Sequence, residues 1–388
     1  MSQSRAFGAI YLSIATSYLG VGLVAPLIPS VLMEHGENSF VVGLIGTTMF
    51  TTFTLASFPI GRVIDRIGPR PVLVGGLIVY GASIALFALK LTTGLFFMAR
   101  AIEGVGAAAI SVATETMISK LSEPNERARR MSYYALSIGI GWAAGPLTGA
   151  LLFKIGPGFP FIACFVLSLL AALFAQGLIP ETAATSHHVE GITTRLTKKI
   201  IVPMSAGGLY GYLMSSLVML IPIYLEKDLH VQKTEIGGII TAVIIGTLLS
   251  QVPIGRAADR FGKRRTLLVC TVVMSIVFAL MSFHNDWRLF IATGAVLGAV
   301  AGSLYPIGLA IIGGIVNKER LGAATSMFSL AFGLGSLVGP TVSGFAMTHY
   351  GDRWLFYIPS ILTLLFALEL IVLYKRIAPR KKTDIPGA

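Results

Sequence analysis

Twelve long apolar runs dominate this sequence of 388 residues and constrain its fold more than any other feature. Each run is about 20 residues or longer, the length that an α-helix needs to cross a hydrocarbon layer roughly 30 Å thick. The runs are continuously apolar rather than alternating, so they predict helices and not the strands of a membrane barrel. They cover approximately residues 7–32, 40–61, 71–90, 94–119, 131–153, 158–179, 200–225, 235–255, 265–284, 288–314, 322–347 and 354–374. The sequence therefore predicts an all-α membrane protein with twelve transmembrane helices.

The positive charges lie unevenly between these runs. Only 12% of the residues are charged, yet the formal net charge is +12. Of the 30 Lys and Arg residues, 23 lie on the side that carries both termini, 6 lie in the opposite loops, and Arg100 lies within a run. An excess of Lys and Arg in short loops marks the cytoplasmic side. We therefore expect a multi-pass protein of the cytoplasmic (inner) membrane with both termini in the cytoplasm, and the charge indicates contact with the lipid bilayer rather than with nucleic acid.

A charged segment flanked by glycines recurs at half the chain length. The second copy begins at Gly255, which is 194 residues after Gly61. A repeat at this spacing indicates one module duplicated. We predict two pseudo-symmetric six-helix bundles, residues 1–180 and residues 200–388, the latter with a short basic tail, joined by a cytoplasmic linker at 181–199. The residues that recur are Gly61, Asp65, Arg66, Gly68 and Arg70 in the first copy and Gly255, Asp259, Arg260, Gly262 and Arg264 in the second, which adds Arg265.

Other classes of protein lack support in the sequence. The sequence shows no convergent nucleophile, base or metal cluster, which an enzyme would need. It also shows no soluble output domain, which a sensor would be expected to carry. His187 and His188 fall in the expected linker and are interpreted as solvated residues rather than metal ligands. The sequence contains no Gly-x-x-x-x-Gly-Lys-Ser/Thr loop, the motif that would indicate ATP as an energy source. We expect no metal and no cofactor.

The repeated segment resembles a signature of the major facilitator superfamily of secondary transporters, and this resemblance covers nearly the whole chain. The family form is Gly-x-x-x-Asp-Arg/Lys-x-Gly-x-Arg/Lys-Arg/Lys; the second copy fits it throughout, whereas the first has Pro71 in place of a basic residue. The resemblance implies the major facilitator fold and a loop that braces one half against the other when the cytoplasmic side is closed. Asp65 would then meet the helix that starts near Gly322, and Asp259 the helix that starts near Met131. The alternative is that these charges only set the topology.

A second resemblance lies in the fourth run. Arg100-Ala101-Ile102-Glu103-Gly104-Val105-Gly106-Ala107-Ala108 is similar to the family's Arg-x-x-Gln-Gly-x-Gly-Ala-Ala, with Glu103 in place of Gln. An arginine inside a membrane span needs a partner, water or a ligand, and Glu103 shares its helix face. We expect Arg100 and Glu103 to handle protons or substrate; the alternative is an Arg100 that snorkels to the outer surface beside Glu103. Glu115 either takes part in the same coupling or pairs with Arg62 or Arg66.

A third resemblance lies in the fifth run and is echoed in the eleventh. The family associates this pattern of glycines and a proline with exporters that exchange protons. In contrast, the carboxylate that many drug exporters of the family carry in the first span is missing between Ser13 and Gly20. The residues of the pattern are Gly141, Gly145, Pro146 and Gly149, echoed by Gly335, Gly339 and Pro340.

The substrate is expected between the two halves near the midplane, where such repeats meet. Tyr18 and Tyr212 are 194 residues apart, and aromatic rings with a polar tip suit an amphipathic ligand. The further candidates for the cavity are Tyr210, Trp142, Gln251 and Tyr305. We expect a monomer that moves a small amphipathic organic molecule by alternating access, with protons as the exchanged ion; the alternative is an uptake symporter or facilitator for a nutrient or metabolite.

Overall fold

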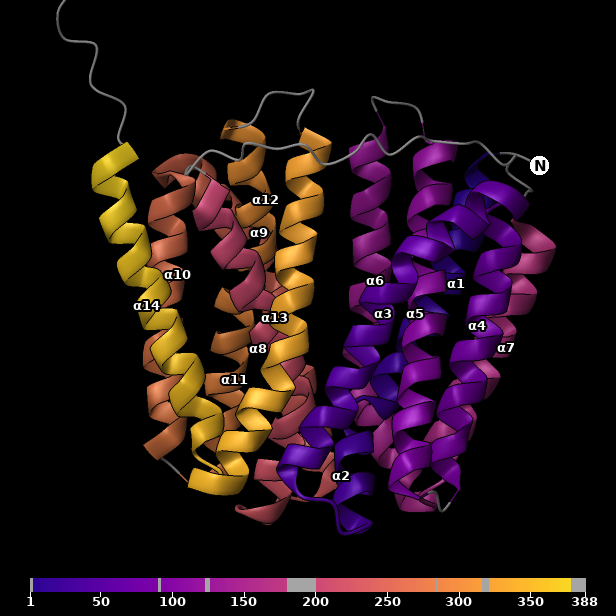
Figure 1. The fold of residues 1–388 in the computed structure, drawn as a ribbon, viewed down its shortest axis with the longest axis horizontal. Helices are drawn as coiled ribbons and strands as arrows, with labels where there is room; N and C mark the ends of the chain where they lie inside the picture. Colours follow the sequence, from indigo (N-terminus) through magenta and orange to yellow (C-terminus); the bar gives the residue numbers. More distant parts are fainter. Residues whose placement is uncertain are drawn as a thin grey trace, which may run out of the picture.

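The computed structural model is entirely helical over the residues that it describes, which are 3–89, 92–122, 126–179, 200–283, 285–315 and 321–377. Twelve of its helical segments are long and apolar enough to span a membrane, which confirms the expected number (Figure 1). The helices are α1 (Gln3–Val24), α2 (Leu27–Glu34), α3 (Ser39–Ile67), α4 (Pro69–Ala85) with the 3₁₀ turn η1 (Leu86–Ala88), α5 (Thr93–Leu121), α6 (Arg127–Ile155), α7 (Phe159–Leu178), α8 (Ile201–Lys227), α9 (Lys233–Phe261), α10 (Lys263–Phe283), α11 (Trp287–Ala301), α12 (Leu304–Ile315), α13 (Leu321–Tyr350) and α14 (Trp354–Ile377).

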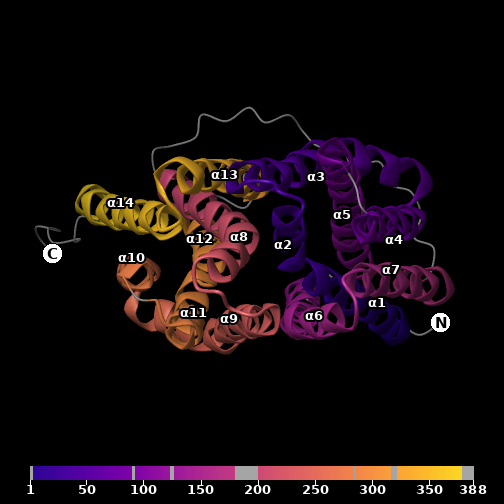
Figure 2. The ribbon, with the colours of Figure 1, turned by 90° about the horizontal axis from the view of Figure 1, so that it is seen from below.

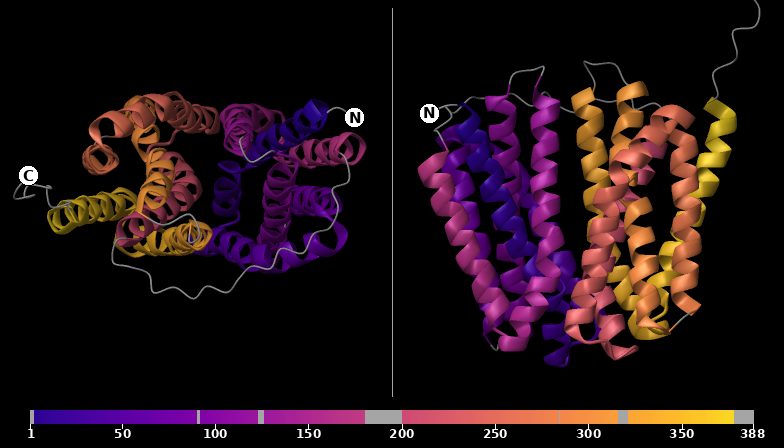
Figure 3. Two further views of the ribbon diagram at one scale, coloured as in Figure 1. Left: turned by 90° about the horizontal axis from the view of Figure 1, so that it is seen from above. Right: turned by 180° about the vertical axis from the view of Figure 1, so that it is seen from behind.

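The helices form two bundles that stand side by side, α1 to α7 in one and α8 to α14 in the other (Figures 1 and 3). The expected linker at 181–199 lies outside the described residues. We call the end at which α3 meets α4 and α9 meets α10 the basic end, and the opposite end the far end. The start of α1 and the end of α14 both lie at the basic end.

Two of the expected spans are interrupted. The first consists of α1 and α2, and the tenth consists of α11 and α12. In each case a proline lacks the N–H that would continue the helix: Pro26 precedes α2 and Pro306 lies in the first turn of α12. Freed backbone groups inside a membrane are tolerated where other parts of the protein cover them.

The glycines of the fifth run set the packing inside each half. A Cβ on Gly141 would lie 2.6 Å from the carbonyl oxygen of Ala15, and the backbone of Gly145 contacts that of Gly22. The helix α6 therefore packs backbone to backbone on α1. The echoed glycines of α13 contact α8 in the same way, with Gly339 against Tyr212. Small residues permit such close crossings in membranes. The pattern that suggested an exporter therefore also joins the first and fifth spans of each repeat.

Two single-residue turns define the basic end. Gly68 separates α3 from α4 and Gly262 separates α9 from α10, with φ angles of 84° and 95°. Residues with a Cβ rarely adopt such angles, which explains why glycine occupies both equivalent positions. In contrast, Gly61 and Gly255 lie inside α3 and α9, and nothing lies within 4 Å of a Cβ built on either, so neither glycine is a site of close helix packing in this arrangement.

Candidate functional site

An ion pair lies in the interior of α5. Arg100 Nη1 donates to Glu103 Oε2 at 2.7 Å, and the two residues are only 5% and 3% exposed. The local pairing expected from their spacing is present, but Arg100 is buried rather than at the surface. Its Nη2 lies 3.1 Å from the sulfur of Met219 on α8, in the opposite half, and its Nε has no hydrogen-bond partner among the described residues. The pair therefore lies where the two halves meet.

The glycines that follow this pair fix the position of α5. A Cβ on Gly104 would overlap the Met49 carbonyl of α3, and one on Gly106 would lie 2.7 Å from the Tyr80 nitrogen of α4. Close backbone contact with two neighbours leaves α5 little freedom to rotate or shift. Arg100, one turn before Gly104, and Glu103, directly before it, are therefore held at a fixed depth in the bundle.

Glu115 lies three turns closer to the basic end on the same helix. Its side chain is exposed and accepts a hydrogen bond from Ser111 at 3.2 Å. No ion pair joins it to Arg62 or Arg66 within the described parts of the chain. Glu115 is thus an exposed carboxylate on the same helix as the buried ion pair.

The candidate cavity residues separate into two groups. Tyr210 and Tyr305 come together, with ring centroids 5.7 Å apart, and both contact Phe332, at 5.8 and 5.7 Å. Phe328 adds an edge-to-face contact to Tyr305 at 5.0 Å. These four rings from α8, α12 and α13 form an aromatic cluster in the C-terminal half.

The other candidates do not join this cluster. Tyr212 is buried, and its hydroxyl lies 2.6 Å from that of Ser343 on α13, so it is bonded within its own half. Tyr18 and Trp142 are half-buried on α1 and α6, and Gln251 is exposed on α9. Their proposed contact with substrate stays a prediction.

The loop residues expected to brace the halves lie apart from the opposite half. Asp65 is half-buried and Asp259 is exposed, and among the described residues no hydrogen bond or ion pair joins either to the other half. Asp65 is expected to meet the start of α13 near Gly322, and the side chains there lie outside the described set. Arg70 Nη1 instead donates to the Ile179 carbonyl at 3.0 Å, within its own half. Bracing by these residues stays a prediction for the arrangement in which the basic end is closed.

The halves meet at the far end through two equivalent contacts. A Cβ on Gly43 of α3 would overlap the Pro340 carbonyl of α13, and one on Gly237 of α9 would lie 2.7 Å from the Pro146 carbonyl of α6. Figure 2 shows these two rows, α3 beside α13 and α9 beside α6. Gly43 and Gly237 are 194 residues apart, as are Pro146 and Pro340. Sequence reasoning missed both glycines, although the repeat spacing contained the signal.

A polar network supports the same closure. Lys233 Nζ, at the start of α9, donates to Glu34 of the other half at 2.8 Å and to Glu226 of α8 at 2.6 Å. Ser30 of α2 donates to the second oxygen of Glu226 at 2.5 Å, and Lys233 lies 5.0 Å from the centroid of the Phe153 ring on α6. These contacts and the glycine contacts close the far end. The other described hydrogen bonds between the halves lie at the same end or midway along the helices.

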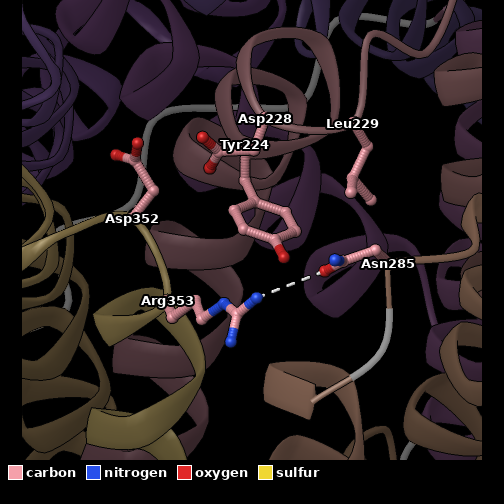
Figure 4. A pocket seen from close by; sticks show the side chains of 6 residues that line it. All are labelled: Tyr224, Asp228, Leu229, Asn285, Asp352 and Arg353. Carbon is pink, nitrogen blue, oxygen red and sulfur yellow. Dashed lines mark hydrogen bonds between the residues drawn. The ribbon is translucent and has the colours of Figure 1, made fainter.

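A polar pocket of about 490 Å³ lies at the far end of the C-terminal half, away from the predicted site residues. Figure 4 shows the carboxylates of Asp228 and Asp352 turned towards each other, and Arg353 beside Asn285, to which it donates at 3.4 Å. Lys227 Nζ donates to Asp352 at 2.9 Å. Partial desolvation and the charge of Asp352 raise the pKa of Asp228. The pocket is lined by Tyr224, Asp228, Leu229, Asn285, Asp352 and Arg353.

Comparisons with known proteins agree with this architecture. The family model described as Major Facilitator Superfamily matches twice, at residues 10–204 and 203–388. The uncharacterized transporter YfkF of Bacillus subtilis is 26% identical over 90% of this chain and 91% of its own length, and Multidrug resistance protein 1 of the same organism is 25% identical over 92% and 93%. The crystal structure of a bacterial homologue of the human lysosomal transporter Spinster, inward-facing and unoccupied, gives a TM-score of 0.78 at 13% identity and covers 96% of this chain and 97% of that one.

Proposed function

The chain belongs to the Major Facilitator Superfamily, and from this premise we propose that it exports small amphipathic organic molecules by alternating access in exchange for protons. Its twelve apolar helices make it a multi-pass membrane protein. The proposed membrane is the cytoplasmic one. The excess of Lys and Arg supports placing the basic end and both termini in the cytoplasm. The proposed working unit is a monomer.

The buried pair on α5 is the observation on which the proton exchange rests. Protonation of Glu103 would leave Arg100 as a buried cation without its counter-charge, and breaking a buried ion pair in this way costs about 3–5 kcal/mol. A movement of the halves that admits water or substrate to Arg100 would relieve this cost. Because Arg100 also contacts Met219 of the opposite half, proton binding and the movement of the halves would be linked.

The aromatic cluster and Glu115 are the proposed substrate contacts. Tyr210, Tyr305 and Phe332 offer ring faces and phenolic hydroxyls, which suit a ligand with both apolar and polar parts. Glu115 offers an exposed carboxylate that can accept a proton or a cationic group of the ligand. The glycine and proline pattern of α6, and a relative named Multidrug resistance protein 1, support export over uptake.

Transport in proteoliposomes tests this function. A thermal-shift panel of tetraphenylphosphonium, ethidium, uridine and neutral aromatic compounds selects the ligand that stabilises the purified protein most. That ligand is then followed across the vesicle membrane together with an internal pH dye. Protons moving opposite to the ligand are expected; protons moving with it would indicate an uptake symporter, and no proton movement would refute the coupling.

Two carboxylate variants assign the coupling. Glu103→Gln should abolish ligand-driven proton movement, because the side chain can no longer release a proton. Glu369→Gln is the matched control, since Glu369 is also a carboxylate in a membrane helix but bonds to Ser205 at 3.1 Å, outside the proposed site. Equal proton movement in both variants and in the unmodified protein would remove Glu103 from the mechanism.

A further inference from the structure

A pocket of about 430 Å³ opens at the basic end of the C-terminal half, where α9 turns into α10 against the end of α12. Neither the transport proposal nor the far-end closure uses it. Its lining residues are Phe261, Gly262, Lys263, Arg264, Arg265, Ala310, Ile311, Gly314 and Ile315.

The pocket has an apolar wall. Four of its residues belong to the last two turns of α12, and the ring of Phe261 faces it from α9 with 61% of its surface exposed. Gly314 leaves the wall open, because the nearest atom to a Cβ built there is Lys263 Nζ at 4.0 Å. A hydrocarbon chain can therefore lie along α12 without displacing a side chain.

The rim of the pocket is cationic. Lys263, Arg264 and Arg265 are consecutive, and Lys263 Nζ donates to the Ala310 carbonyl at 2.7 Å, which holds its ammonium group over the apolar wall. The first turn of α10 contains no acidic residue. Within the described residues no carboxylate forms an ion pair with these three cations, and the nearby Asp259 is exposed. Three adjacent positive charges at a membrane surface repel one another unless an anion lies among them.

The first repeat provides an internal comparison. The equivalent positions there are Pro69, Arg70 and Pro71, so one cation stands where the second repeat has three. That one cation, Arg70, donates to the Ile179 carbonyl at the end of α7. The cationic rim is therefore a property of the second repeat alone and does not follow from the need for a positive loop.

We propose that this pocket binds an anionic phospholipid of the leaflet at the basic end, with its phosphate on Arg264 and Arg265 and an acyl chain along α12. A basic pocket between membrane helices on the cytoplasmic side is a recognised kind of site for anionic headgroups. The apolar wall selects a lipid over a free phosphate ion, because only a lipid covers both surfaces. Each Lys or Arg at such a surface strengthens binding about fivefold.

Native mass spectrometry of the purified full-length protein tests the proposal. Phosphatidylglycerol and phosphatidylcholine of equal chain length are titrated separately, with inorganic phosphate as a competitor. Phosphatidylglycerol should bind more tightly than phosphatidylcholine, and millimolar phosphate should displace it poorly. Equal affinity for the two lipids, or full displacement by phosphate, would overturn the proposal.

Variants then locate the site. Arg264→Gln with Arg265→Gln should weaken phosphatidylglycerol binding about 25-fold, whereas Arg70→Gln in the first repeat should leave it unchanged. Gly314→Leu fills the apolar wall without altering a charge and should also reduce binding. Thermal unfolding identifies any variant that fails to fold, and the remaining variants still decide whether the lipid binds in this pocket. Equal losses in Arg70→Gln and the double variant would show general surface attraction and refute a site in this pocket.

Discussion

Substituting alanine for Gly237 or Gly43 should force the two halves apart at the far end. A Cβ on Gly237 would lie 2.7 Å from the Pro146 carbonyl oxygen and 3.2 Å from the Ala150 Cβ. An unstrained contact between heavy atoms is roughly 3.5 Å, so α9 and α6 would have to separate by about 0.8 Å. Gly43 is closer still to the Pro340 carbonyl. In both cases the neighbour is backbone, which cannot rotate away as a flexible side chain does.

The strain acts on one arrangement of the halves only. Overpacking of this kind costs about 1–3 kcal/mol, and it disappears when the far end opens. The equilibrium should therefore move towards the arrangement open at the far end by about 5- to 150-fold. Gly43→Ala should give the larger shift of the two, because its overlap is the greater.

Double electron–electron resonance measures this shift. Spin labels at Lys154 and Arg288 occupy exposed far-end positions in opposite halves, while the native Cys164 and Cys270 are buried. Both glycine variants should populate longer distances than the parent protein. Gly75→Ala is the matched control, since nothing lies within 4 Å of a Cβ on that glycine. If all three variants give the same distance distribution, the glycine contacts do not hold the far end closed.

Three further predictions concern charged residues. Lys233→Gln removes the cation that pairs with Glu226. It should favour opening of the far end by about fivefold, since partly exposed ion pairs contribute up to about 1 kcal/mol. An unchanged distance distribution between the same two labels would contradict this prediction. Asp65→Asn should increase the population open at the basic end, and unaltered thiol accessibility on both faces would count against a bracing role. The pKa of Asp228 is raised by partial desolvation and by Asp352, so the native state holds this proton more tightly than the unfolded chain, and the free energy of unfolding should fall as pH rises above about 4. Asp228→Asn should flatten that fall in thermal unfolding between pH 4 and 7. If the variant keeps the pH dependence of the parent protein, Asp228 is not the group responsible.

The repeat spacing predicted more of this protein than any single motif. It related Gly68 to Gly262, where the structure shows a glycine with a positive φ angle at both helix-to-helix turns. Applied to every glycine and proline, it would also have paired Gly43 with Gly237 and indicated a shared contact at the far end. Duplication preserves backbone contacts because they depend on small side chains and helix crossings, and those leave a trace in the sequence at a fixed offset.

The polar network at the far end left no such trace. The position equivalent to Lys233 in the first repeat is Ser39, and the position equivalent to Glu226 is Leu32. Lys233 reaches Glu34 across 199 residues only because the ends of α2, α8 and α9 converge. No periodicity or motif spacing encodes that convergence. The same reason applies to the contact between Arg100 and Met219, which joins residues 119 apart in different halves.

The two rows that close the far end share a backbone contact and differ in their polar contacts. Between α3 and α13, Thr47 donates to the Leu337 carbonyl at 2.9 Å and lies 2.7 Å from the Thr341 hydroxyl. At the equivalent place between α9 and α6, Leu147 replaces Thr341, and the Thr241 hydroxyl has no partner among the described residues. Hydroxyl bonds of this kind contribute about 0.5–1.5 kcal/mol each and do not weaken with salt, whereas the Lys233 contacts beside the second row are screened. Opening of the far end should therefore begin between α6 and α9, with the α3–α13 row as the side that separates last.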